Sequence, residues 1–414
     1  MLGFLVLFAY GIFSLSFGIR NAASQSRDLA PVYMASRLWL EGSNPYQPPG
    51  LKPWQEAWPA EAFPSKYTNS TVSSPYPPIA LMNLSLLGRL DWPVARNIWL
   101  AVNLFLVFYI PWLIRRIWYP AWSASATALF VAFWMGGLGV RVTLGLGQHG
   151  LLAFAFLLTA LWRIQSGKPA AGIFLALSSH KPNLAVCYLV SLAPKIPRRA
   201  LLSAVFVFLA LYILFFVRMG SHAAESASSF KNSLLWWVRA WETSYPGTCL
   251  LPVLSRLLGR PWAAGILLNL LRVAGLGVYF WVFRRNRLFP TDIEFGTLSL
   301  LSLWLMYHGF QDTFLLILPI TALAHRIKAL WSSNFRWVCL FFLVCLTGMW
   351  FTNASKLYLF FFSAPFGQLH ETGLYGMLVN GYRLLIFAAF LGMLLLQLRG
   401  VRGFSDRIVA GPSE

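Results

Sequence analysis

The chain has 414 residues, of which 58% are hydrophobic and 11% are charged, and its formal net charge is +20. A soluble chain is normally about one quarter charged, so this composition excludes a soluble fold and predicts an all-α polytopic integral membrane protein. The Arg and Lys residues are spread through short loops, which favours a role in membrane topology and contact with anionic lipids over nucleic acid binding.

Apolar windows recur along the chain and predict about 10–13 transmembrane helices, some of them broken or re-entrant. We expect one integral membrane domain over residues 1–414, with a first external loop at 20–75 and a second, interfacial loop at 218–260. An amphipathic helix near 29–41 opens the first loop, and Gly42 is suited to end it. The windows lie at about 2–19, 76–90, 97–114, 121–140, 149–162, 169–193, 200–217, 262–283, 294–306, 310–325, 337–352 and 374–398.

Asp28 lies where the first predicted helix leaves the membrane, with Arg27 before it and Arg37 nine residues after it. One interpretation is helix capping, in which Ser26 or Asp28 meets the positive end of the helix dipole. The other is catalytic: a carboxylate at the lipid–water boundary can take a proton from an acceptor hydroxyl. Neighbouring arginines would keep that carboxylate ionised. The sequence leaves both interpretations open.

The polar stretch "SSHKPN" interrupts the apolar window at 169–193, and it contains Lys181 and Pro182. A hairpin of two short helices with this stretch at its tip would reconcile the window with the basic loops on either side. Lys181 either snorkels to the interface or binds a lipid-linked phosphate in a cavity. Pro182 would break the helix and leave backbone groups facing that cavity.

Three further stretches carry candidate residues that could line a sugar or acceptor site. In "GLGQHGLLAF", Gln148 and His149 form either a simple turn with a polar cap or a contact for hydroxyl or phosphate groups. In "SPYPPIAL", the prolines predict a rigid extended entry to the next helix. In "MYHGFQDTF", a structural polar pair between helices is the alternative to a site. The candidate lining residues are Tyr33, Tyr76, Gln148, His149, His308, Gln311 and Asp312.

Motifs that are absent also narrow the function. The sequence has no Walker A stretch and no dinucleotide-binding fingerprint, which excludes a Rossmann-type nucleotide-sugar site in this chain. A donor that is already in the membrane fits best. No Cys/His cluster is present, and zinc binding by His308 and Asp312 would need further ligands, so we expect neither a metal nor another cofactor.

The order of these motifs resembles glycosyltransferase family 87, a group of polytopic enzymes of the GT-C class. The similarity rests on "RDLAPVYMASRLWLEGSNPYQP", "SPYPPIALMNLSLLGRL", "GLGQHGLLAFAFLLTALW" and "AAGIFLALSSHKPNLAV". It covers about residues 1–200 well and the rest loosely. It implies a GT-C-like helix bundle with amphipathic interfacial helices in the first external loop.

The resemblance also implies an activity. A hexose, typically mannose, would pass from a polyprenyl-phosphate donor to a lipid or glycan acceptor, with inversion, at the outer face of the plasma or inner membrane. Asp28 matches the catalytic base, and Lys181 with Arg27 and Arg37 would hold the donor phosphate. The donor, the acceptor and membrane lipids are then the partners, and nucleic acid is not.

The sequence departs from the family in its second half. A Trp-x-His motif is common before the late Pro-containing helix, whereas here the stretch is "GFQDTFLLILP", with Asp312 at the place of the His. This difference leaves the acceptor and the sugar open. A lipid-linked glycan flippase is the main alternative from another class, and a membrane scaffold would leave Lys181 without a purpose.

Overall fold

The computed structural model describes residues 2–24, 26, 28–46, 74, 76–244, 254, 258–283, 291–306, 310–330, 336–351 and 373–398. Within these ranges every regular element is a helix and no strand occurs. The chain divides into two compact units. Unit 1 comprises Met1–Leu189 and Ile196–Tyr245, and unit 2 comprises Val190–Lys195 and Pro246–Glu414. That residues 1–414 form a single membrane domain stays a prediction.

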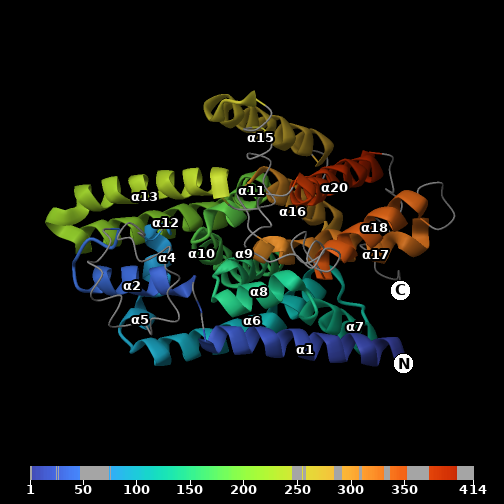
Figure 1. Cartoon of the computed structure of the whole chain (residues 1–414), viewed down its shortest axis with the longest axis horizontal. Helices are drawn as coiled ribbons and strands as arrows, with labels where there is room; N and C mark the ends of the chain where they lie inside the picture. Colours follow the sequence, from blue (N-terminus) through green and yellow to red (C-terminus); the bar gives the residue numbers. More distant parts are fainter. Residues whose placement is uncertain are drawn as a thin grey trace. The chain divides into compact units, whose positions relative to one another are not determined.

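Apolar helices of different lengths make up most of unit 1 (Figure 1). The first, α1, lies along α7 and α8, where Gly11 and Gly18 allow a close approach. A Cβ atom on either glycine would lie 2.9 Å from the nearest atom of the facing helix. These helices are α1 (Leu2–Ser24), α6 (Trp92–Trp118), α7 (Ala124–Met135), α8 (Leu138–Leu146), α9 (Gly150–Gln165), α10 (Ala171–Ser178), most of α11 (Pro182–Leu192) and α12 (Arg198–Met219).

Four described helical stretches are long and apolar enough to cross a membrane: Leu2–Ser24, Trp92–Trp118, Arg198–Leu235, which begins with α12, and Ala263–Phe283. A fifth span results if α7 and α8, which are bent by 56°, count as one. The prediction of about 10–13 spans is therefore higher than the number of full-length ones in the described part of the chain. Several apolar windows form shorter helices, such as α9 with 16 residues and α11 with 11, whereas a straight span needs about 20.

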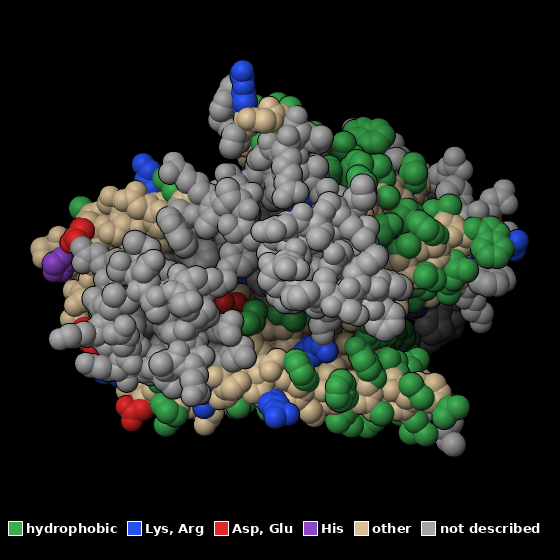
Figure 2. All heavy atoms as spheres, in the orientation of Figure 1, with side chains coloured by type: hydrophobic (Ala, Val, Ile, Leu, Met, Phe, Trp, Pro, Cys, Tyr) green, Lys and Arg blue, Asp and Glu red, His purple; other side chains and the backbone are tan. Residues whose placement is uncertain are grey.

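Exposed side chains on the long helices are large and apolar. Phe13 on α1 is 62% exposed, and Phe206 on α12 is 72% exposed. Figure 2 shows hydrophobic side chains gathered over the region of α1. Such surfaces are stable against lipid and unfavourable in water, so the chain is a multi-pass membrane protein.

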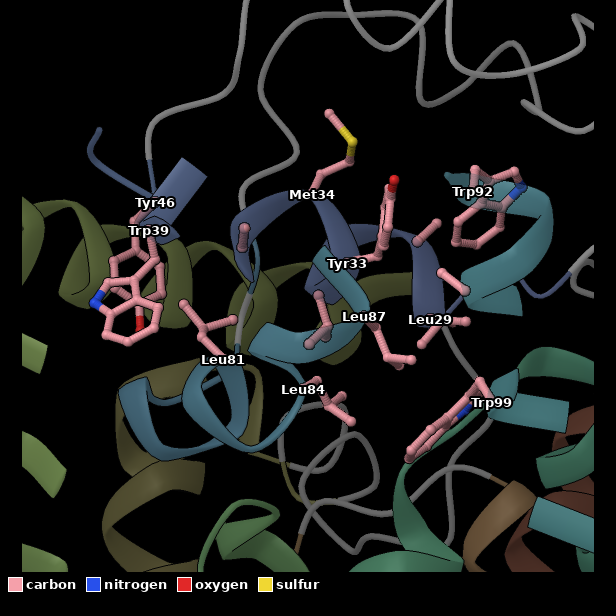
Figure 3. Packing of buried hydrophobic residues seen from close by; sticks show 14 of the residues in the cluster. Leu29, Tyr33, Met34, Trp39, Tyr46, Leu81, Leu84, Leu87, Trp92 and Trp99 are labelled. Carbon is pink, nitrogen blue, oxygen red and sulfur yellow. The ribbon is translucent and has the colours of Figure 1, made fainter. Parts of the chain in front are cut away.

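Helix α2, in the polar stretch after α1, packs in a separate hydrophobic cluster (Figure 3). The predicted amphipathic helix is α2 (Leu29–Leu40), and Gly42 ends it with a φ of +77°, as expected. The window at 76–90 is not a span, because it forms two short helices beneath α2, namely α4 (Pro78–Asn83) and α5 (Ser85–Gly88). A Cβ on Gly88 would lie 2.9 Å from the backbone nitrogen of Arg37, so only glycine allows this packing.

The second long polar segment forms η3 (Gly220–His222) and α13 (Ala223–Ser244). The chain turns back after α12, because Phe215 of α12 and Phe230 of α13 both pack against Tyr46. Figure 1 shows α13 lying along α12. One helical hairpin thus supports the cluster around α2, and a position in the membrane interface stays a prediction.

Unit 2 is built around α16, whose residues are all buried. Helices α15, α17 and α20 contact α16, and α18 contacts both α17 and α20. The described elements are α15 (Pro261–Phe283), α16 (Asp292–Leu305), η4 (Phe310–Leu316), α17 (Ile317–Leu330), α18 (Arg336–Phe351) and α20 (Gly373–Leu398).

Candidate functional site

The candidate site in unit 1 begins at the end of α8, where Gly147 reverses the chain. Gly147 has a φ of +68°, its N–H donates to the Leu144 carbonyl at 3.2 Å, and the Gln148 N–H donates to the Thr143 carbonyl at 2.9 Å. This pair of bonds is the Schellman ending of a helix, which favours glycine at the left-handed position. The Trp99 indole also donates to the Gly147 carbonyl at 2.9 Å. The side chain of Gln148 is thereby held at a fixed place.

Asp28, which follows α1 in the chain, lies beside this turn at the end of α8. Its backbone N–H donates to the Leu146 carbonyl at 2.9 Å, which joins the loop before α2 to the end of α8. Asp28 occupies the N-cap position of α2, but its side chain makes no capping hydrogen bond. The Ser26 hydroxyl is directed to the Ala22 carbonyl at 2.7 Å instead. Helix capping therefore does not account for the Asp28 carboxylate.

Gln148 connects Asp28 with Lys181. Its amide nitrogen donates to Oδ2 of Asp28. Its amide oxygen accepts from Nζ of Lys181 at 3.4 Å and from the Tyr76 hydroxyl at 3.5 Å. The amide can point only one way, because a carboxylate accepts hydrogen bonds and an ammonium group donates them. The structure thus brings together four predicted site residues from four separate connections between helices.

His149 follows Gln148 in the chain and packs against Tyr76 of this network. It is fully buried, and neither ring nitrogen has a hydrogen-bond partner among the described residues. The Tyr76 ring lies 4.7 Å from the imidazole, and the Trp99 ring lies 5.4 Å away at a near-perpendicular angle. Unpaired polar atoms in such a place are costly, which makes His149 a candidate for contact with a ligand hydroxyl.

The "SSHKPN" break lies between α10 and α11, as predicted from the interrupted window. Lys181 is buried, with 5% of its surface exposed, so it does not snorkel to solvent. His180, which we did not select from the sequence, is fully buried beside it. Its ring nitrogens lie 2.8 Å from the Leu177 carbonyl and 3.2 Å from the His149 carbonyl.

Two predicted residues of α2 lie in other surroundings. Tyr33 is buried in the cluster of Figure 3, where its hydroxyl donates to the Leu90 carbonyl at 2.7 Å. Arg37 is exposed and forms an ion pair with Glu41 at 3.3 Å. The Tyr33 hydroxyl, and then the Glu41 carboxylate, raise the pKa of Arg37, so Arg37 stays a cation. Their side chains bond to residues other than Gln148 and Lys181, and Arg27 lies outside the described residues.

The later candidates belong to unit 2. His308 and the side chain of Gln311 lie outside the described residues, and Asp312 is buried in η4. Our motif reading missed Glu294, which is fully buried and accepts hydrogen bonds from Lys195 and from the Tyr279 hydroxyl. An acidic residue inside an otherwise apolar window was the signal available for it.

A second buried ion pair lies at the start of the same helix. Arg326 donates to both carboxylate oxygens of Asp292, at 2.6 and 2.7 Å. Planar pairs of this kind fix geometry as well as charge, so the first turn of α16 is anchored twice. Within the described part of the chain, no three His, Cys, Asp or Glu side chains gather in a way that could hold a metal ion. Transfer without a metal stays a prediction.

The site in unit 1 combines a carboxylate, a buried ammonium group, an amide and a buried imidazole. The carboxylate can accept a proton, and the ammonium can stabilise negative charge on a leaving group. Such a combination suits the transfer of a group from an anionic carrier to a hydroxyl.

Comparison with known protein families gives a match over the middle of the chain. The model described as glycosyltransferase family 87 matches residues 75–307, which is more than half of the chain. The matched region includes Tyr76, Gln148, His149 and Lys181, and it begins after Asp28. The searches of curated proteins and of solved structures gave no match.

Proposed function

Because the chain belongs to glycosyltransferase family 87 and is a membrane glycosyltransferase, we propose that it moves a hexose from a polyprenyl-phosphate carrier to a lipid or glycan acceptor. Mannose is the first hexose to test, and the reaction inverts the anomeric carbon. It takes place at the outer face of the plasma or inner membrane and requires no metal ion.

The observation that carries this proposal is the bridge made by Gln148 between Asp28 and Lys181. Asp28 takes the proton of the acceptor hydroxyl as the hydroxyl oxygen bonds to the anomeric carbon. The bond between that carbon and the phosphate oxygen breaks at the same time, and its electron pair leaves with the phosphate. Lys181 stabilises the negative charge on that phosphate. Inversion needs one base and no covalent intermediate.

His149 and Tyr76 complete the proposed sugar site. The two unpaired ring nitrogens of His149 can accept or donate one hydrogen bond each to a sugar hydroxyl. The Tyr76 hydroxyl already contacts Gln148, and the Tyr76 ring lies 4.7 Å from the His149 ring. A site built to bond a hydroxyl rejects sugars that lack it.

The test is transfer by purified protein in liposomes, supplied with radiolabelled polyprenyl-phosphate mannose and a membrane lipid extract. Asp28→Asn should lower the rate by about 10²–10⁴-fold, because it removes the base. The Asn oxygen can still accept the bond from Gln148, so the fold is kept. Asp91→Asn is the matched control, since Asp91 is an exposed carboxylate of the same unit without a capping bond.

Full activity of a folded Asp28→Asn protein would contradict the role of the base. No transfer from mannose, glucose or galactose donors, together with movement of labelled carrier lipid across the bilayer, would instead support a flippase.

A further inference from the structure

His180 is a fully buried imidazole that contacts two separate breaks in the chain. Its Nδ1 lies 2.8 Å from the Leu177 carbonyl oxygen, three residues earlier in the same break. Its Nε2 lies 3.2 Å from the His149 carbonyl oxygen, 31 residues away in the other break. A neutral imidazole can donate to one of these oxygens, and the doubly protonated ring can donate to both.

The His149 carbonyl is well placed to receive this bond. It begins α9 and already accepts the Ala153 N–H at 3.1 Å, and a carbonyl oxygen has a second lone pair for the imidazole. The ring of Phe156 stands edge-on to His180 at 6.0 Å, which limits the rotation of the imidazole. The tie between the two breaks is therefore specific in direction and lies in surroundings closed to water.

Each end of this tie is next to a site residue. His180 directly precedes Lys181, and His149 directly follows Gln148. The side chains of Lys181 and Gln148 meet at 3.4 Å. A shift of one break against the other would change that distance, because Gln148 is carried by one break and Lys181 by the other. We propose that His180 is a positioning residue that holds the ammonium group of Lys181 against the Gln148 amide for binding of the donor phosphate.

This inference rests on the proposed function only for its kinetic effect. The tie itself can be measured without any substrate, by hydrogen exchange of backbone amides followed by mass spectrometry. A ring that only fills space would be replaced well by His180→Phe, which keeps the aromatic contact and removes the hydrogen bond that the imidazole donates. A ring that ties the two breaks by a hydrogen bond would not be replaced by phenylalanine.

Two amide variants separate the two contacts of the imidazole, to the Leu177 carbonyl and to the His149 carbonyl. In His180→Gln the side-chain nitrogen lies near the place of Nε2 and can keep the bond to His149. In His180→Asn it lies near the place of Nδ1 and can keep only the local bond to Leu177. The exposed His222, on η3 in the same unit, supplies the control His222→Phe.

We expect His180→Phe and His180→Asn to speed exchange at least ten-fold in peptides covering 146–152 and 177–184. His180→Gln should stay within about three-fold of the parent protein, and His222→Phe should be unchanged. In the transfer assay, His180→Phe and His180→Asn should raise KM for the donor at least ten-fold, while kcat falls by a smaller factor. His180→Gln should have a KM close to that of the parent protein.

The outcomes separate the inference from the function on which it rests. Unchanged exchange in His180→Phe, or the same exchange in the Gln and Asn variants, would overturn the tie. Faster exchange over the whole of unit 1 would show a general loss of stability and would also overturn a positioning role. Selective exchange in the two breaks, in a protein whose parent form transfers no sugar, would keep the tie and refute the proposed function.

Discussion

The substitution Gly147→Ala tests whether the backbone turn at the end of α8 sets the position of Asp28. Its φ is +68°, and a Cβ at this residue would lie 3.0 Å from the Leu29 Cβ and 3.3 Å from the Ser26 Cβ. Leu29 is fully buried and cannot move aside freely. Ser26 and Leu29 lie on either side of Asp28, so a methyl group at 147 would push directly on the loop that carries the carboxylate.

The cost of Gly147→Ala has two parts. A non-glycine residue in the left-handed region costs about 1–2 kcal/mol, and crowding the methyl against buried neighbours adds about 1–3 kcal/mol. Gly167, at the end of α9, isolates the first part. Its φ is +66° and no atom lies within 4 Å of its Cβ position, while its N–H and that of Lys168 donate to the last turn of α9 in the same pattern. Gly167→Ala therefore pays the backbone cost alone.

Both variants should unfold at a lower temperature than the parent protein, and Gly147→Ala should be the less stable of the two. Only Gly147→Ala should lose activity, by about ten-fold, because misplacement of a catalytic group by 1 Å can cost about 10²-fold and the shift here is smaller. Thermal unfolding and the rate of sugar transfer would be measured on the same preparations. Equal transfer rates for the two folded variants would refute the idea that the Gly147 turn sets the position of Asp28.

Two further predictions concern residues outside the catalytic network. Tyr33→Phe removes the hydrogen bond to the Leu90 carbonyl and should lower the free energy of unfolding by about 1 kcal/mol. The rate of sugar transfer should change little. A large rise in KM would instead show that Tyr33 contacts the sugar. Glu294→Gln leaves the buried Lys195 without its carboxylate and should destabilise unit 2 by about 3–5 kcal/mol. Glu41→Gln breaks an exposed ion pair and should cost less than about 0.5 kcal/mol, so similar thermal shifts for the two variants would contradict the argument from burial.

Much of the architecture followed from patterns in the sequence. The apolar windows predicted most of the helices, and the interrupted window at 169–193 predicted the break that carries Lys181. The prediction of a span at 76–90 was misleading, because most of the apolar residues in this window pack against α2. Periodicity cannot separate these two kinds of burial when a window is short.

The candidate site was foreseen in part, through the cost of placing polar groups among apolar ones. That reasoning selected Asp28, Gln148 and Lys181, which the structure brings together. It missed His180, since a histidine beside a lysine in a polar break has no separate signal, and its role depends on a carbonyl 31 residues away. It also included Tyr33 among the lining residues, although the partner of that hydroxyl is set by tertiary packing.

The polar residues gather where the helices are broken for a reason that concerns the backbone. Each break frees N–H and C=O groups, which in an apolar environment must find partners within the protein. Here the freed carbonyl groups find donors within the protein. The Asp28 N–H donates to the Leu146 carbonyl, and the Trp99 indole donates to the Gly147 carbonyl. The His180 imidazole meets the His149 carbonyl in the same way. A loop held by such bonds has little freedom, so the carboxylate and the ammonium group keep their positions before a substrate arrives. Under the proposed function, this preorganisation lets the ammonium group stabilise the charge that develops on the leaving phosphate.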